Sequence, residues 1–451
     1  MIRDVQPIIT TRFEHDDSHL LERYLATGGY EGLRAALRVP PQRVVEHVKT
    51  ASLLGRGGAG FAAGVKWGFL PPGKYPYYVV VNGDESEPGT YKDRLLMERD
   101  PHQLIEGLLI CCYAVGAAQA FFYVRGEMAL AQERIAAALN EANEAGYVGR
   151  GICGTEFSCD IILTWGAGAY IVGEETALIE SLEGERGMPR LKPPYFPAAI
   201  GLYQQPTIVN NVETLANLPW IMSNGGQAFA DLGAETSRGT RMFAVSGHVQ
   251  RPGVYEVEFG VTTFRDLIYA PVFCGGIRGD RAIKAFIPGG ASAPWFFEEH
   301  LDLPLEAGAV GQAGSMLGSG AIIVMDETTD VVKACHRVVR FFARESCGKC
   351  TPCREGTAWL EKILQRIIDG EGRPGDVDLL LDVSDNISPG ITWPPRQTTI
   401  CPLGPSAVSP IASAVSRFRD EFERYVGSPV AITVPMNGAA YRAAETEPAG
   451  V

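Results

Sequence analysis

The sequence lacks an excess of positive charge. Lysine and arginine number 40 against 53 aspartates and glutamates, so the formal net charge is −13. Nucleic-acid-binding proteins and polybasic membrane surfaces carry the opposite sign. We therefore expect neither nucleic acid nor a lipid surface as a direct partner, while docking to other proteins stays open.

The sequence also lacks an apolar run that reads as one membrane-spanning helix. The stretch from Gly107 to Val124 comes nearest, with Gln119 as its only strongly polar side chain, but Gly116-Ala117-Ala118 interrupts it. The two halves predict a buried helix followed by a strand, and both are too short to cross a bilayer. No secretory signal is visible in residues 1–17, so we expect a soluble chain.

Disordered and collagen-like chains are excluded by the composition, which is 46% hydrophobic and 21% charged, as in ordinary globular proteins. At roughly 100–200 residues per domain, the length predicts two to four domains. A disulfide-stapled protein is not expected, because the ten cysteines accompany no secretory signal. Six of them occur in apolar or unpatterned contexts and are interpreted as small buried side chains: Cys111, Cys112, Cys153, Cys159, Cys274 and Cys335.

Helical and β-rich patterns alternate over residues 41–238, which is typical of an α/β domain with a largely parallel sheet. Residues 1–40 are interpreted as an N-terminal surface extension with one helix near 18–26. The domain is predicted to contain strands at 77–82, 120–124 and 161–164, and helices at 102–115 and 126–145.

The pattern changes near residue 240. Short β-rich runs between glycine and proline turns predict a small β-rich domain at 239–328, with strands at 242–249, 253–259, 285–288 and 321–325 and a helix at 263–269. Apolar residues then recur at three- and four-residue spacing and predict a helical bundle at 329–426, with helices at 330–344, 355–368, 375–387 and 406–426. Residues 427–451 are expected to form a loosely held tail.

The strongest chemical signal is a cysteine triplet in the helical part. Cys347, Cys350 and Cys353 follow a C-x2-C-x2-C spacing, and Cys401 is the only cysteine after them. This spacing with a distant fourth thiolate is typical of a [4Fe–4S] cluster. Zinc and plain buried cysteines are the alternatives. Zinc sites usually pair C-x2-C with a second such pair or with histidines, and no histidine follows His336.

A glycine-rich loop at 55–61 contains the spacing G-x-G-x-x-G, with Arg56 and Lys66 nearby. The dinucleotide fingerprint needs a strand immediately before such a loop, whereas residues 42–54 predict a helix. An ordinary Rossmann site is therefore not expected. The loop could still bring its backbone close to a phosphate or a ring; a packing turn is the alternative.

Two acidic stretches accompany this loop. The segment 82–87 follows a predicted strand, and the carboxyl ends of strands are where α/β sheets bind ligands. The segment 173–175, Gly-Glu-Glu, precedes a helical run, so its backbone amides would face whatever binds there. Asn210 and Asn211 could hold a ring edge or form a turn. Solvated acidic loops are the alternative for both stretches.

Together these segments resemble the flavoprotein NADH-binding subunit of bacterial and mitochondrial complex I, which is the F subunit in bacteria. The resemblance covers roughly residues 40–425. The matching motifs are GRGGAGF at 55–61, NGDESEPGTYKDR at 82–94, GAYIVGEETALIESLEG at 168–184, PTIVNNVETLANLP at 206–219 and SCGKCTPCREG at 346–356.

The resemblance implies an atypical Rossmann-like domain that binds FMN and NADH together, then a ubiquitin-like domain and a helical bundle with a [4Fe–4S] cluster. The thiolates of Cys347, Cys350, Cys353 and Cys401 would bind the cluster. The FMN site would comprise Gly55, Arg56, Gly57, Gly58, Gly60, Lys66, Asn82, Asp84, Glu85, Tyr170, Gly173, Glu174, Asn210, Asn211 and Thr214. The nucleotide would meet Phe61, Phe69, Glu87, Glu175 and Lys192, with Glu87 accepting from the adenosine ribose and favouring NADH over NADPH.

The implied function is electron input to NADH:quinone oxidoreductase, from NADH to FMN, to the cluster and then to partner subunits. Those partners would be a thioredoxin-like [2Fe–2S] subunit and a multi-cluster iron–sulfur subunit. The chain would lie in the peripheral arm on the cytoplasmic side of the inner membrane and meet the membrane only through partners. The alternatives are a diaphorase subunit of a soluble formate dehydrogenase or hydrogenase, and a redox-inactive scaffold that binds zinc. The diaphorases often carry extra thioredoxin-like or ferredoxin segments, which are not seen here.

Three features depart from the family pattern. Lys192-Pro-Pro-Tyr-Phe-Pro contains one aromatic residue more than the usual motif, so either Tyr195 or Phe196 would contact the nucleotide. A segment beginning at Ser388 lengthens the chain between Cys353 and Cys401. Pro402 and Pro405 also follow Cys401.

Overall fold

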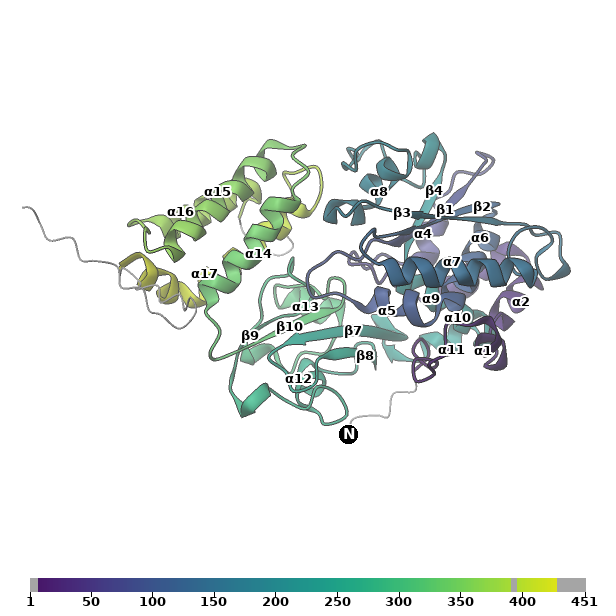
Figure 1. Ribbon diagram of the computed structural model, residues 1–451, viewed down its shortest axis with the longest axis horizontal. Helices are drawn as coiled ribbons and strands as arrows, with labels where there is room; N and C mark the ends of the chain where they lie inside the picture. Colours follow the sequence, from purple (N-terminus) through teal and green to yellow (C-terminus); the bar gives the residue numbers. More distant parts are fainter. Residues whose placement is uncertain (1–6, 391–395, 428–451) are drawn as a thin grey trace, which may run out of the picture.

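The computed structural model describes residues 7–390 and 396–427 and has three parts (Figure 1). The first is a four-stranded parallel sheet in the order β3-β2-β1-β4. Its strands are β1 (Tyr78–Gly83), β2 (Gln119–Val124), β3 (Asp160–Trp165) and β4 (Thr207–Asn211). The first three confirm the predicted strands, whereas β4 falls on residues for which no strand was predicted.

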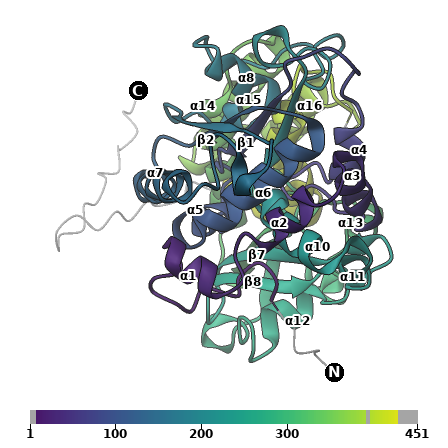
Figure 2. The ribbon, with the colours of Figure 1, turned by 90° about the vertical axis from the view of Figure 1, so that its right-hand side faces the viewer.

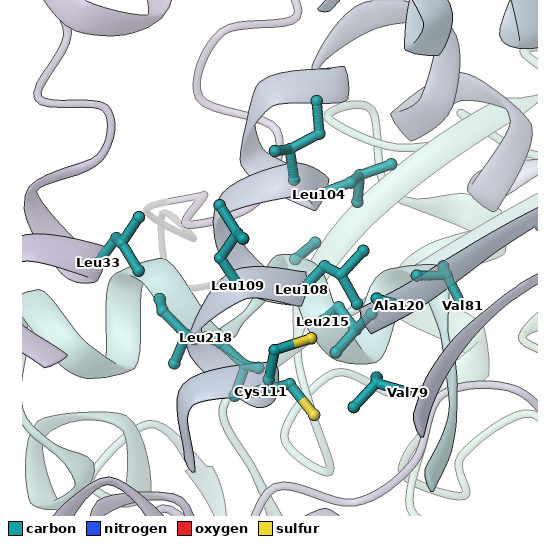
Figure 3. Close-up of a cluster of buried hydrophobic side chains, with 14 of the residues drawn as sticks. Leu33, Val79, Val81, Leu104, Leu108, Leu109, Cys111, Ala120, Leu215 and Leu218 are labelled. Carbon is teal, nitrogen blue, oxygen red and sulfur yellow. The ribbon is translucent and has the colours of Figure 1, made fainter. Parts of the chain in front are cut away.

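The core of this part is built around α6 (Pro101–Val115), nearly all of whose residues are buried. The helix begins where the Asp100 side chain accepts from the backbone N–H of Gln103, and it ends at Gly116 with a positive φ of 77°. Figure 3 shows leucines of α6 packed against valines of β1 and against Leu215 and Leu218. This packing fixes the sheet edge that carries the site.

Further helices cover the two faces of the sheet. Helix α7 (Ala129–Glu144) confirms the helix predicted at 126–145. Helix α3 (Pro41–Thr50) overlaps the helix predicted at 42–54 but ends four residues earlier. The remaining elements are α3 (Pro41–Thr50), α4 (Ala63–Trp67), α5 (Lys92–Arg99), α7 (Ala129–Glu144), α8 (Glu175–Leu182), α9 (Val212–Ala216), α10 (Leu218–Asn224), α11 (Gly226–Ala230) and the pair β5 (Gly233–Ala234) and β6 (Ser237–Arg238).

The N-terminal segment is not the surface extension that was predicted. It contains α1 (Leu21–Ala26) and also α2 (Glu31–Leu37), which lies against α6 and α10 (Figure 2). Glu106 of α6 is buried and accepts hydrogen bonds from the backbone N–H groups of Tyr30 and Leu33, at 2.7 and 2.8 Å. A buried carboxylate satisfied by this segment ties it to the core.

The second part is a four-stranded sheet in the order β8-β7-β10-β9. Strands β7 and β10 are parallel at its centre, while β8 and β9 pair antiparallel at the edges. Helix α12 begins with a capping box between Thr263 and Asp266. The bounds are β7 (Thr240–Gly247), β8 (Gly253–Glu258), α12 (Phe264–Tyr269), β9 (Ile283–Ile287), α13 (Ala307–Gln312) and β10 (Ala321–Asp326).

The third part is a group of four helices, as the apolar spacing predicted: α14 (Val331–Glu345), α15 (Thr351–Ile368), α16 (Asp376–Ile387) and α17 (Leu403–Gly427). Their buried faces form one apolar cluster with residues of β9 and β10. Part of the lengthened segment after Ser388, and nearly all of the predicted tail, lie outside the described residues. Within the described chain, none of the helices combines the length and apolarity that crossing a membrane requires.

Candidate functional site

The predicted ligand-binding stretches meet at the carboxyl ends of β1 and β4. These neighbours pair Val81 with Asn210 and Asn82 with Asn211, so the acidic segment after β1 lies beside the Asn-Asn pair. Asn82 Nδ2 donates to the carbonyl of Gly173 at 2.8 Å, which brings the second acidic stretch to the same place. This edge is the usual ligand site of parallel α/β sheets.

The glycine-rich loop lies against this edge and follows a helix instead of a strand. A Cβ at Gly57 would lie 3.0 Å from Asn211 Cβ. Gly58 (φ +132°) and Gly60 (φ +66°) have open space where a side chain would be. The loop therefore presents bare backbone to the site, and such a cradle fits a phosphate or a ring of FMN.

Arg56 is the residue of this loop whose side chain lies in the core and not at the site. Its side chain is fully buried and donates to the carbonyls of Leu54, Arg238 and Thr240 at 3.0–3.1 Å. Burial lowers the pKa of Arg56 to about 9, which leaves it charged at neutral pH. The guanidinium thus anchors the loop to the core, and only the backbone N–H of Arg56 remains beside the site, donating to Thr214 Oγ1 at 2.9 Å.

Asp84 and Glu85 are buried, so the alternative of a solvated acidic loop does not hold for them. Glu85 accepts from the backbone N–H groups of Asp93 and Arg94, both at 2.8 Å, at the start of α5. Burial raises the pKa of Glu85 to about 8 and that of Asp84 to about 7. Asp84 also accepts a short hydrogen bond from Ser86. The hydrogen bonds of these two side chains therefore stabilise the conformation of the acidic loop.

Glu87 is held at both of its carboxylate oxygens. Tyr170 donates its hydroxyl to Oε2 at 2.7 Å, and the backbone N–H of Ser292 donates to Oε1 at 2.7 Å. Burial raises the pKa of Glu87, while these two donors act against that rise. Ser292 comes from the loop after β9 and was not among the predicted site residues. Its only sequence signal is the run Pro-Gly-Gly-Ala-Ser at 288–292.

The second acidic stretch pairs with Lys192. Glu174 is the N-cap of α8 and accepts from the backbone N–H groups of Thr176 and Ala177. Lys192 Nζ lies 2.8 Å from Glu174 and 2.7 Å from Glu175. Lys192 therefore lies beside the two glutamates that the family resemblance placed around the cofactor and the nucleotide.

Aromatic rings are exposed near the glycine-rich loop, as a nucleotide-stacking surface requires. Phe61 is 46% and Phe69 57% exposed, and their ring centroids lie 5.8 Å apart. The carbonyl of Phe61 accepts from the N–H of Gly55 and closes the loop. Tyr195 and Phe196 are both exposed as well, so the choice between them stays open.

Three further predicted residues make internal contacts at this edge. Lys66 Nζ donates to the carbonyl of Val209 at 2.7 Å, and burial lowers its pKa. Asn211 accepts from the N–H of Thr214 and caps α9, and it donates to Asp93. Asn210 donates to Cys111 Sγ at 3.4 Å. Both asparagines are thus in ordered strand and cap geometry, and the turn alternative is wrong.

Six cysteines were predicted to be small buried side chains. Five of them are buried, whereas Cys153 is only partly buried.

The four cysteines of the triplet and its distant partner lie together in one apolar cluster. Cys353 and Cys401 are buried, and Cys347 and Cys350 pack against them. No three His, Cys, Asp or Glu side chains converge on a single metal ion in the described residues.

The donor set nevertheless fits an iron–sulfur cluster, which binds each of its four thiolates through a different iron atom. Gly348, with a φ of +79°, permits the tight loop between the first two cysteines. Burial raises the pKa of Cys353 to about 11 and that of Cys401 to about 12. These thiols need a cationic centre to become thiolates at neutral pH.

The cysteine cluster lies next to the sheet edge at which the predicted ligand-binding stretches meet. Tyr170, which binds Glu87, packs in the same apolar cluster as the cysteines. Its backbone N–H donates to Glu345 at 3.0 Å, at the last residue of α14 before the cysteine loop. Lys349 in that loop donates to the carbonyl of Pro189 at 2.7 Å.

Comparison with known proteins agrees with this division into two sites. Residues 48–220 match the Nuo51 FMN-binding domain, and residues 333–425 match the NADH-ubiquinone oxidoreductase-F iron–sulfur binding region. The NADH-quinone oxidoreductase F subunit of Mycobacterium tuberculosis is 48% identical over 428 residues, covering 93% of each chain. The chain belongs to the family of NADH-quinone oxidoreductase F subunits. The predicted cofactors, FMN and a [4Fe–4S] cluster, and NADH as substrate are confirmed for the family.

Two other relatives extend the comparison. The NADH-quinone oxidoreductase F subunit of Escherichia coli is 44% identical and covers 95% of both chains. The crystal structure of an NAD+-reducing [NiFe]-hydrogenase in the air-oxidized state has a TM-score of 0.76 at 32% identity. That match covers 96% of this chain and 67% of the hydrogenase chain. The diaphorase alternative is therefore less supported than membership of the F subunits.

Proposed function

We propose that this chain is the electron-input subunit of an NADH:quinone oxidoreductase. The observation that carries the proposal is that four sequence stretches of the FMN-binding region meet at one sheet edge, beside a cluster of four cysteines. Bound FMN supplies the chemistry that the side chains lack, since it accepts the two electrons of a hydride and passes them on singly. The residues of the chain supply binding and orientation.

The glycine-rich loop is proposed to hold FMN with the N–H groups of its backbone. Asn82, Asp84, Glu85 and the N-terminal residues of α8 and α9 would complete the walls. Burial keeps much of Asp84 and Glu85 protonated at neutral pH. These walls therefore disfavour an added negative charge, and oppose the reduced state of the cofactor, increasingly as the pH rises. Phe61 and Phe69 are proposed to stack on the rings of NADH, for which their exposure leaves room.

Glu87 is proposed to accept hydrogen bonds from the adenosine ribose. Tyr170 and Ser292 each use one acceptor position of its carboxylate, and a carboxylate has about four. Acceptor positions therefore remain for two ribose hydroxyls. A 2′-phosphate would instead meet a fixed negative charge, which favours NADH over NADPH.

Cys347, Cys350, Cys353 and Cys401 are proposed as the cluster ligands. The second sheet is proposed to be a ubiquitin-like domain, which its central parallel pair β7–β10 and the packing of α12 against the sheet support. The domain limits at 238, 328 and 426 are retained as part of the proposal, whereas the limit at 40 is not, because the N-terminal segment packs on the core. The partners are proposed to be a thioredoxin-like [2Fe–2S] subunit and a multi-cluster subunit, in a peripheral arm on the cytoplasmic side of the membrane.

An anaerobic titration of the purified protein with NADH, and separately with NADPH, tests the proposal in the visible spectrum. NADH should bleach the flavin band and lower the cluster absorbance. Bound flavin that NADH leaves oxidised would refute the nucleotide site, and a colourless zinc protein would refute the redox function. Iron and labile sulfide analysis of the same sample then distinguishes a protein with an iron–sulfur cluster but no reaction with NADH from a zinc protein.

The variant Glu87→Gln tests the proposed selectivity. Removing the negative charge should raise kcat/KM for NADPH relative to NADH by about tenfold, which corresponds to about 1.4 kcal/mol. Glu133→Gln is the matched control, because Glu133 is an exposed carboxylate on α7. An unchanged ratio in Glu87→Gln would contradict the assignment.

A further inference from the structure

The acidic segment of the nucleotide site is bound along its length by the second sheet. Beyond the bond from Ser292 to Glu87, the N–H of Ala291 donates to the carbonyl of Pro88 at 3.2 Å. Thr90 and Ser319 share a short hydroxyl–hydroxyl hydrogen bond. The segment that selects the nucleotide therefore rests on a different part of the molecule from the sheet that carries it.

The same contact continues to the start of α5. The Tyr91 hydroxyl donates to the carbonyls of Val245 in β7 and Gly253 in β8, at 2.8 and 3.1 Å. A Cβ at Gly89 would lie 2.8 Å from the Ile323 side chain in β10, so the Gly89 backbone packs directly against that side chain. Each of the five residues from Glu87 to Tyr91 thus contacts the second sheet or one of the loops that join its strands.

Gly290 stands at the tightest point of this contact. It is buried and has a φ of +94°, and the three atoms nearest to a Cβ built on it all belong to Glu87. The distance to Glu87 Cγ would be 2.5 Å. A side chain at this position has to displace the Glu87 side chain, which the N–H of Ser292, two residues later, binds at Oε1.

We propose that the loop 289–293 is a specificity-determining element that holds the Glu87 carboxylate in the orientation that selects NADH. The inference rests on the proposed role of Glu87 and adds the residues that fix it. A carboxylate bound at both oxygens cannot turn away from a 2′-phosphate, so NADPH meets its full charge. When the loop no longer fixes it, the carboxylate loses its alignment with the ribose hydroxyls and gains the freedom to turn away from the phosphate.

The test is Gly290→Ala in the full flavin-loaded protein, with kcat and KM measured for NADH and for NADPH. We expect KM for NADH to rise about tenfold, and the NADH/NADPH ratio of kcat/KM to fall at least about fivefold. Gly314→Ala is the matched control, since Gly314 also has a positive φ of +90° and a Cβ built on it would meet open space. A purely structural defect would lower activity with both nucleotides equally, and that result would overturn the inference.

The double variant Glu87→Gln/Gly290→Ala separates the inference from the function on which it rests. We expect its ratio to equal that of Glu87→Gln alone, because the loop acts through Glu87. Additive effects would overturn the inference and leave the role of Glu87 standing. An unchanged ratio in Glu87→Gln would refute that role itself, whatever Gly290→Ala does.

A φ of +94° suits glycine but strains alanine, so poor folding of Gly290→Ala is a practical outcome. The variant Ser319→Ala then tests the inference. It removes the hydroxyl that binds Thr90 and leaves the backbone unchanged. We expect a fall of about two- to threefold in the NADH/NADPH ratio, in the same direction. A ratio equal to that of the wild type would overturn the inference.

Discussion

Arg56→Met tests whether the glycine-rich loop is fixed from inside the protein. The guanidinium is fully buried and donates three hydrogen bonds to backbone carbonyls. It also lies 4.0 Å from the buried carboxylate of Glu213, and the Phe259 ring is 4.7 Å from its carbon. Methionine keeps part of the apolar volume and removes every one of the donors.

The expected loss in the free energy of unfolding is about 3–5 kcal/mol. A hydrogen bond to a charged group contributes about 1.5–3 kcal/mol, but three bonds to one guanidinium do not add. Breaking a buried ion pair from one side costs about 3–5 kcal/mol. Glu213 retains its ion pair with Lys92, at 2.7 Å. We therefore add no further penalty for an unpaired buried carboxylate. It is a large part of the roughly 5–15 kcal/mol that stabilises a domain.

Urea unfolding of the flavin-free protein measures this loss, and the FMN that remains after dialysis reports on the loop. Arg56→Met should retain less FMN, and excess FMN should restore it. The control is Arg94→Met, whose exposed pair with Glu98 on α5 contributes about 0.5 kcal/mol or less. If Arg56→Met unfolds within about 1 kcal/mol of the wild type and retains FMN equally, the anchoring role is refuted.

Two more predictions concern buried acid and thiol groups. Burial raises the pKa of Asp84 from 3.8 to about 7 in the folded chain, so the folded state binds the extra proton and wild-type stability falls as pH rises between these values. Between pH 5.5 and pH 8, the free energy of unfolding of the wild type should fall by about 2 kcal/mol more than that of Asp84→Asn. Urea unfolding of both flavin-free proteins measures this difference, and the same pH dependence in the two would contradict the prediction. Cys401→Ala should abolish bound iron and retain FMN, whereas Cys335→Ala, which alters a buried cysteine of α14, should keep both. Full iron content in Cys401→Ala would exclude it as a ligand.

The regular helices and strands could be predicted because each depends mainly on its own residues. Apolar spacing predicted a helix at 102–115, and α6 spans Pro101–Val115. Strand β4 was missed because it is short and ends in Asn-Asn, a pair typical of turns. It becomes a strand because it pairs with β1, and such tertiary pairing overrides local preference. The second helix of the N-terminal segment was missed for the same reason, since its buried face packs against α6 and α10, which are distant in sequence.

The site was predicted as a set of residues but not as an arrangement. Motifs identified the carboxylates and cysteines, because the chemistry of a cofactor limits the residue types that can bind it. Which carboxylates point inward depends on contacts between distant segments. Glu85 caps α5, and Glu87 meets Ser292 across 205 residues of sequence. Arg56 was assigned to the ligand because its position in the motif is visible in the sequence, whereas its three carbonyl acceptors are not.

The glycine-rich loop lies at the sheet edge without the strand that precedes such a loop in a dinucleotide fingerprint. In a dinucleotide fingerprint the strand fixes the direction of the loop. Here the loop is closed by the bond from Gly55 to Phe61 and held to α9 by the bond from Arg56 to Thr214. The guanidinium of Arg56 then binds the carbonyl of Thr240, the first residue of β7. The second sheet thus fixes both this loop and the acidic segment at Glu87, so it determines the shape of the site from outside the domain that carries the FMN-binding motifs.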